Sequence, residues 1–257
     1  MNRRRFVAGA ASAGMGASAV AAGSKNAIFE LRYFWLRNGN QAQRTSEFIG
    51  KHYLPAARRA GAGPMGFFAA VIAEQSPFLL ALTSYSSLAG MESTLEQMAS
   101  DTEFQKRSSE YDSPNELSYI RMENTLLRGF DTMPQIVVPS SEDSRAARIF
   151  ELRTYESNTA KAGKRKIRMF EEGEIGVFKR LGMAPVFFGE AIVGRNLPHL
   201  TYMLAFDDLA HREKAWRAFG SDPEWQKMRA MPGVSDPEIV SNISNAILRP
   251  LPFSPIK

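Results

Sequence analysis

The chain has 257 residues, of which 44% are hydrophobic and 23% are charged. This composition excludes a disordered charged tail and supplies enough apolar material for one or two packed domains. The formal charge of +5 falls to +2, from 29 basic against 27 acidic residues, when the arginines at 3–5 are set aside, so no nucleic-acid-binding surface is predicted. Because the chain has no cysteine, disulfides, thiolate metal sites and cysteine nucleophiles are excluded.

The first 23 residues combine a basic cluster with a weakly apolar stretch rich in alanine and glycine. Arg3, Arg4 and Phe6 match the pattern of a twin-arginine export signal, which this segment resembles. The small residues that end the stretch predict cleavage after Ala21 or Ala22, and an uncleaved membrane anchor is the alternative. The apolar stretch is shorter than the ~20 residues that a spanning helix needs, which favours cleavage. The resemblance implies export by the twin-arginine translocase to a periplasmic or secreted location.

The rest of the chain is an internal repeat with a shift of 121 residues. The sequence IFELR at 28–32 recurs at 149–153, and DTEFQK at 101–106 recurs as DPEWQK at 222–227. Between the two copies lies a segment rich in proline, serine and charged residues, which is typical of a linker. We therefore divide the chain into a signal peptide, a first domain, a linker and a second domain, at 1–22, 27–130, 131–147 and 148–257.

Both domains are predicted to contain the same elements in the same order. Alternating apolar residues indicate an opening strand, and apolar residues at helical spacing indicate the helix that follows it. Two apolar runs separated by a turn predict a hairpin, after which come a second helix, a short helix with an aspartate N-cap and a closing strand. For the hairpin and the closing strand, the expected bounds are 65–85 and 119–127 in the first domain, and 185–206 and 240–248 in the second.

This order predicts an α+β protein built from two tandem ferredoxin-like βαββαβ domains. Each unit packs its helices on one face of a four-stranded antiparallel sheet and leaves the other face uncovered. Two units on one chain can cover each other, so we expect them to pack as an intrachain α+β barrel with a ligand cleft between the sheets. Trp35 follows the first strand, has no aromatic counterpart in the second domain and is expected to line this cleft or an interface.

The chain resembles the NIPSNAP family, within the larger group of dimeric α+β barrels. The motifs that carry the resemblance are IFELRTYE at 149–156, FKRLGMAPVFFG at 178–189 and WRAFGSDPEWQKM at 216–228, all in the second domain. The first domain departs from these motifs, so we expect that one domain carries the function and the other has a supporting role. The resemblance implies binding and interaction rather than a settled reaction. Fold relatives include cofactor-free monooxygenases, haem enzymes and stress-response binding proteins, so the fold alone does not choose a function.

The polar faces of the strands carry the candidate ligand-binding residues. The apolar residues of the opening strands are expected to face the helices, which would place Glu30 and Arg32 on the inter-sheet side. By the repeat, Glu151 and Arg153 take the same side in the second domain. These four charged residues are therefore predicted to point into the cleft.

The closing strand of the first domain is expected beside its opening strand, so Arg121 and Glu123 would face the opposite charges across the strands. The equivalent residues in the second domain are Asn242 and Ser244, so that domain lacks the charged partners. Two interpretations stay open: a self-paired charge ladder, since buried charge is costly unless paired, or a small polar or acidic ligand held by the fork of Arg153. The candidate ligand-binding residues are Glu30, Arg32, Arg121, Glu123, Glu151, Arg153 and Asn242.

The sequence contains no motif that predicts a metal site or a nucleotide site. His52, on the first helix, could be a haem or metal ligand in the manner of some fold relatives. Metal sites need several clustered ligands, however, and His52 stands alone. His199 in a turn and His211 early in a helix are both expected to be solvated. We therefore expect no metal and no cofactor.

The favoured function is an exported, non-catalytic protein that binds a small ligand or a partner through the inter-sheet cleft. The alternative is a cofactor-independent oxygenase, isomerase or lyase for an aromatic or hydrophobic substrate, with Glu151 as base and Arg153 as anion stabiliser. A third interpretation is a scaffold that associates through exposed sheet edges or helices. The sequence also leaves open whether the chain forms a homo-oligomer. A cleft of roughly 300 Å³ or more that holds Glu151 with a raised pKa would favour the enzyme.

Overall fold

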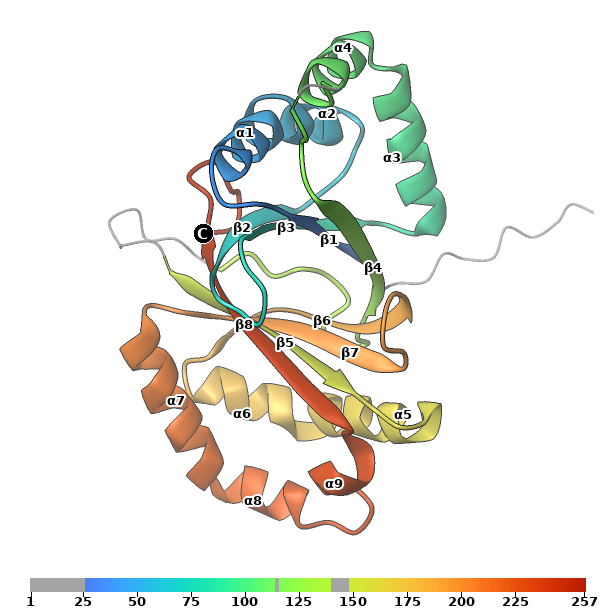
Figure 1. Cartoon of the computed structure of the whole chain (residues 1–257). Coiled ribbons are helices and arrows are strands. Elements are labelled where there is room, and N and C mark those ends of the chain that lie inside the picture. Colours follow the sequence, from blue (N-terminus) through green and yellow to red (C-terminus); the bar gives the residue numbers. More distant parts are fainter. Residues whose placement is uncertain (1–25, 114–115, 140–147) are drawn as a thin grey trace, which may run out of the picture.

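The computed structural model describes residues 26–113, 116–139 and 148–257. The signal-peptide residues Arg3, Arg4 and Phe6 lie outside the described residues. The described chain forms two halves with matching elements (Figure 1). The first half contains β1 (Ile28–Trp35), α1 (Gln41–Phe48), a π-helical segment (Ile49–Tyr53), α2 (Leu54–Arg59), β2 (Met65–Ile72), β3 (Phe78–Tyr85), α3 (Leu88–Ser100), α4 (Thr102–Tyr111) and β4 (Arg121–Gly129).

The second half repeats this order and adds one short helix before its last strand. It contains β5 (Ile149–Glu156), α5 (Ala160–Met169), a π-helical segment (Phe170–Glu174), α6 (Ile175–Arg180), β6 (Ala184–Val193), β7 (His199–Phe206), α7 (Leu209–Ser221), α8 (Pro223–Arg229), α9 (Asp236–Ile239) and β8 (Asn242–Pro250). The two βαββαβ units predicted from the repeat are therefore present.

The eight strands close into one antiparallel barrel in the order β1-β3-β2-β8-β5-β7-β6-β4. Each half supplies a four-stranded sheet, and the sheets join where β2 pairs with β8 and β4 pairs with β6. Because neighbouring strands alternate in direction, the equivalent strands β1 and β5 run the same way along the barrel. Equivalent residues of the two halves therefore lie at the same level in the barrel.

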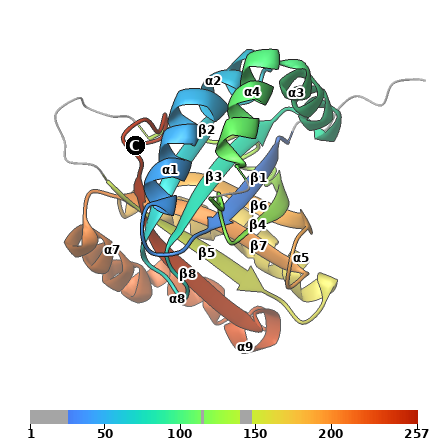
Figure 2. The same ribbon diagram turned by 45° about the horizontal axis from the view of Figure 1, so that its top comes forward.

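The helices of the two halves cover opposite sides of the barrel (Figures 1 and 2). Aspartate and serine side chains begin these helices: Ser87 accepts from the backbone N–H of Gly90 at α3, and Asp208 accepts from that of His211 at α7. The aspartate N-caps expected for the shorter helices are confirmed, at Asp101 for α4 and at Asp222 for α8. None of the helices in the described ranges is long and apolar enough to cross a membrane.

Apolar side chains fill the inside of the barrel over much of its length. Phe29, Phe68, Phe150 and Phe187 are all fully buried in this barrel core. At the end where β2 and β6 begin, the loop residue Ile136 and Ile256 near the C-terminus complete the same core. Within the described residues, apolar side chains therefore close this end of the barrel.

Candidate functional site

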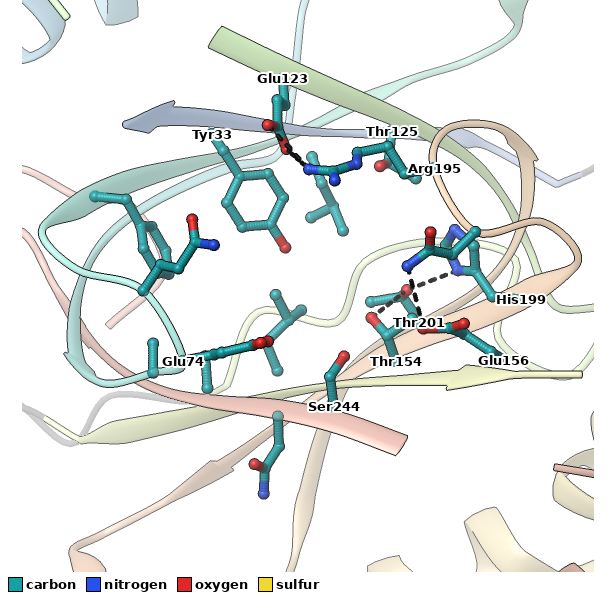
Figure 3. Close-up of a pocket in the computed structure, with 18 of the residues that line it drawn as sticks. Tyr33, Glu74, Glu123, Thr125, Thr154, Glu156, Arg195, His199, Thr201 and Ser244 are labelled. Carbon is teal, nitrogen blue, oxygen red and sulfur yellow. Dashed lines mark hydrogen bonds and ion pairs between the residues drawn. The ribbon is translucent and has the colours of Figure 1, made fainter. Parts of the chain in front are cut away.

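The end of the barrel where β1 and β5 finish contains a cavity of about 370 Å³. The strands β3, β4, β7 and β8 begin at this end, and the β2–β3 and β6–β7 hairpins form part of the rim. Figure 3 shows Tyr33 pointing into the cavity from one side, with Thr154 and Ser244 on the other side. The inter-sheet cleft predicted from the sequence is thus a cavity at one mouth of the barrel.

The first half supplies an aromatic wall, formed by Tyr33, Trp35 and Phe78. The rings of Tyr33 and Trp35 stack with centroids 5.8 Å apart, and Phe78 lies 5.4 Å from the first ring and 5.1 Å from the second. The indole Nε1 of Trp35 is buried and has no hydrogen-bond partner among the described residues. A buried donor without a partner is costly, so this N–H is a polar group that the described residues leave unsatisfied.

The second half supplies a polar wall. The Oγ1 atom of Thr201 lies 2.9 Å from Oγ1 of Thr154 and 3.3 Å from Nδ1 of His199 (Figure 3). Ser244 and Glu156 also line this side, and Glu156 accepts hydrogen bonds from the side-chain amides of Asn196 and Asn242. This wall offers several hydroxyl groups, an imidazole and a carboxylate within one surface.

The two walls come from equivalent positions of the repeat, because most of these residues are related by the same shift of 121. An aromatic, apolar or charged residue in the first half is exchanged for a smaller or more polar one in the second. The exchanged pairs are Tyr33 and Thr154, Trp35 and Glu156, Phe78 and His199, Leu80 and Thr201, and Glu123 and Ser244.

The cavity contains more acidic than basic side chains. Glu74, Glu123 and Glu156 line it together with one basic residue, Arg195. Burial alone would raise the pKa of Glu123, but hydrogen bonds from Arg121 and Arg195, at 2.6 and 3.1 Å, lower it, so this carboxylate stays ionised. The field in the cavity therefore favours a neutral or positively charged ligand over an anion.

Two titratable groups in the cavity are kept neutral near pH 7. Burial lowers the pKa of His199 below its ordinary value of 6.5, against smaller opposing effects of a backbone hydrogen bond and Glu156. Burial raises the pKa of the Tyr33 phenol, and the nearby charge of Glu123 raises it further. The site thus presents a neutral imidazole and a protonated phenol.

The expected orientation of the opening strands is wrong. Phe29 and Leu31 point into the barrel core, whereas Ile28 and Phe34 pack under the helices. Glu30, Arg32, Glu151 and Arg153 alternate with the core residues, so they lie between the sheet and the helices rather than in the cavity. A barrel of this size must fill its interior with side chains, so both faces of β1 and β5 are buried and alternation alone does not identify the inner one.

In the first half, Glu30 and Arg32 belong to a polar network under the helices. The Glu30 carboxylate is fully buried and accepts hydrogen bonds from Arg32 at 2.7 Å, Asn124 at 2.8 Å and Tyr85 at 3.0 Å. The expected ladder with the closing strand is wrong, because the neighbour of Arg32 on β4 is Asn124. The expected partners lie on the other face of β4, where Arg121 stacks 4.8 Å above the ring of Trp35.

In the second half, the carboxylate of Glu151 has more hydrogen-bond partners than that of Glu30, although the sequence predicted fewer charged partners for it. Its carboxylate accepts from Arg153 at 2.9 Å, Arg212 at 2.6 Å, the indole of Trp216 at 2.7 Å and Asn245 at 3.2 Å. Burial would raise the pKa of Glu151, but Arg212, Arg153 and Trp216 lower it. This carboxylate lies outside the cavity and is a weak base, so the geometry does not support it as a general base.

Among the other candidate residues, Glu123 lines the cavity, whereas Asn242 does not line it but donates to the lining residue Glu156 at 3.0 Å. Trp35 lies in the cavity, one of its two expected places. His199 was expected to be solvated, but it is buried at the start of β7. The sequence signal that could have found this wall was the exchange of apolar for polar residues between equivalent positions.

The residues described, 26–113, 116–139 and 148–257, contain no group of three or more histidine, aspartate and glutamate side chains that could hold a metal ion. The ring of His52, a candidate metal or haem ligand by its sequence position, packs against that of Phe48 with the centroids 6.1 Å apart.

The barrel of two ferredoxin-like halves is shared with other solved structures. A "putative monooxygenase" from Fusobacterium nucleatum superposes with a TM-score of 0.57 at 8% identity, over 88% of this chain and 93% of that one. A "putative monooxygenase" from Lactobacillus acidophilus gives 0.55 at 10% identity, over 87% and 93%. An anthrone oxidase-like protein gives 0.53 at 11% identity, over 88% and 92%. At such low identity these likenesses show the fold alone.

The NIPSNAP family model matches residues 29–134 and 150–255, which is one copy in each half. The chain therefore belongs to the NIPSNAP family, as its motifs indicated. A search of curated proteins finds no significant match.

Proposed function

We propose that this protein binds a small organic molecule in the cavity at the barrel mouth and does not transform it. The observation that carries the proposal is that one cavity of about 370 Å³ joins an aromatic wall to a polar wall. Ligand sites of this kind are concave and mostly apolar, with a few polar groups that fix orientation. The ligand would stack an aromatic face on Tyr33 and Phe78.

The charge of the cavity selects the ligand class. Because the carboxylates of Glu74, Glu123 and Glu156 outnumber the basic side chains that line the cavity, an aromatic amine is favoured over an aromatic acid. Aromatic faces add to this preference, since they attract cations.

Phenethylamine and phenylacetate test the proposal, because they share a ring and differ in charge. Binding is followed by the NMR signal of the Trp35 indole N–H, which is specific to this cavity. We expect the amine to bind at least tenfold more tightly than the acid, and Phe78→His, which installs the residue of the second half, to weaken it. Leu209→His, at an exposed position on α7, is the matched control. Equal binding of amine and acid, or equal behaviour of the two variants, would refute the proposal.

An enzymatic function has one observation in its favour, the neutral imidazole of His199 in the cavity. A neutral imidazole can take a proton from an activated aromatic substrate, and Thr201 holds its Nδ1 side. One fold neighbour is named as anthrone oxidase-like. Oxidation of anthrone by dioxygen yields anthraquinone and water, and His199 would accept the proton that leaves C10.

Oxygen consumption with anthrone distinguishes the two functions. For an oxygenase we expect turnover that His199→Phe abolishes, whereas a binding protein shows no turnover above a blank. Turnover that persists in His199→Phe would argue against this histidine as the base.

We further propose that the protein is exported by the twin-arginine route, as Arg3, Arg4 and Phe6 predict. Fractionation of cells that produce the full chain should place the mature protein in the periplasm or the medium. Replacing both arginines by lysine should retain it in the cytoplasm, and unchanged export would overturn the assignment.

A further inference from the structure

A second cavity, of about 240 Å³, lies between the helices and the sheet of the first half. Its walls come from β1, the first helical stretch and the two helices α3 and α4. Phe48 and Tyr111 stack here with centroids 4.2 Å apart, and Phe104 lies 6.1 Å from Phe48. Leu95 forms part of the rim and is 39% exposed. Dry apolar cavities of about 150 Å³ already bind benzene, so this volume is sufficient for a substituted ring.

The repeat explains why this cavity exists in the first half. Leu95 and Phe104 correspond to Trp216 and Trp225 in the second half, at the same shift of 121. The larger indole of Trp216 packs against Phe178 and Phe219 and lies 4.6 Å from the guanidinium carbon of the equivalent arginine, Arg153. The smaller Leu95 leaves the corresponding volume beside Arg32 open.

Arg32 is the basic residue of this cavity and keeps one donor for a ligand. Its Nε and Nη2 atoms both donate to Glu30, while Nη1 makes no hydrogen bond to the described residues. In the second half, Arg153 instead uses Nη1 for Glu151 and Nη2 for the hydroxyl of Tyr155. Burial disfavours the charge of Arg32, but Tyr53 and Glu30 raise its pKa, so it remains a cation.

We propose that the first half binds a small aromatic carboxylate in this cavity, with its ring beside Phe48 and Leu95 and its carboxylate on Nη1 of Arg32. A charge-assisted hydrogen bond to a guanidinium is stronger than a neutral one. The acidic lining residue, Asp112, is exposed and accepts the hydroxyl of Ser118, so it lies at the rim. This site is separate from the cavity at the barrel mouth and selects a ligand of the opposite charge.

Benzoate and its neutral analogue benzamide test the proposal by NMR of methionine methyl groups in the full chain. The buried methyl of Met98 lines this cavity and is the specific reporter. We expect benzoate to shift the Met98 signal and to bind roughly tenfold more tightly than benzamide, which corresponds to about 1.4 kcal/mol. The Trp35 signal at the barrel mouth should stay unchanged. Equal affinity for benzamide, or a benzoate response at Trp35 alone, would overturn the assignment.

Leu95→Trp is the decisive variant, because it installs the side chain that fills the second half. We expect it to abolish the benzoate response at Met98 without lowering the melting temperature. Leu88→Trp is the matched control, since Leu88 is exposed on the same helix and does not line the cavity. If Leu95→Trp folds and still binds benzoate, the proposal is wrong. Arg32→Lys should weaken benzoate more than benzamide, and equal weakening would also contradict it.

Discussion

The two halves of this protein share one fold and one register, yet they use equivalent positions for different chemistry. At the barrel mouth the first half is aromatic and the second is polar, so the pair forms a cavity that neither could form alone. Under the helices the difference is one of volume, since Leu95 leaves space where Trp216 fills it. Duplication therefore provided two copies of each site, and divergence made each copy different.

The largest expected effect comes from the buried carboxylates. Glu151→Ala should lower the free energy of unfolding by about 3–5 kcal/mol, because Arg153 and Arg212 would lose their shared partner. Glu30→Ala should cost less, because only one arginine, Arg32, depends on that carboxylate. Chemical denaturation of both variants measures the difference. Equal losses would show that the networks of the two halves are equivalent in energy.

Truncation of a side chain in the helix layer should also cost more stability in the second half than in the first. Trp216→Ala should cost about 3 kcal/mol, because it removes a large packed ring and the hydrogen bond to Glu151. Leu95→Ala should cost about 1 kcal/mol, since this side chain is partly exposed and borders a cavity already. Thermal and chemical unfolding check both values. A larger loss at Leu95 would indicate that the first-half cavity is filled in solution.

The polar wall and the aromatic wall of the cavity should contribute differently to the pH dependence of the free energy of unfolding. The pKa of His199 in the folded state is below 6.5, so well above pH 6.5 the imidazole is neutral in both states and pH has no effect through it. As the pH falls through 6.5 toward the lower pKa of the folded state, the unfolded chain binds the proton first, and the free energy of unfolding decreases. His199→Phe, which copies Phe78, should remove this part of the decrease. Identical pH profiles would mean that His199 is not buried as a neutral group.

The smallest effect is expected at the rim. Arg195 is 72% exposed and pairs with Glu123, and exposed ion pairs contribute about 0–1 kcal/mol. Arg195→Ala should therefore leave the free energy of unfolding nearly unchanged. It should weaken any residual binding of phenylacetate at the mouth, because it removes a basic side chain from the cavity. A loss above about 2 kcal/mol would show that the ion pair is structural.

Several features of the fold could be predicted because they are repeated or local. The shift of 121 residues relates IFELR in β1 to IFELR in β5, and the aspartates before α4 and α8 cap their helices as expected. The site was predicted in part, since Trp35 and Glu123 line the cavity. His199 was missed because a histidine next to proline and a turn resembles a solvated loop residue.

The sequence by itself determined the duplication, the order of elements, the family and the pairing of two sheets, because each depends on local propensity or on comparison of one half with the other. Only the tertiary structure decided which face of each strand points into the barrel. Both faces of these strands are buried, so apolar alternation satisfies either orientation, and the choice depends on closing eight strands around one packed interior. That choice placed Glu30 and Glu151 under the helices, and it placed Tyr33 and His199 in the lining of the cavity at the mouth.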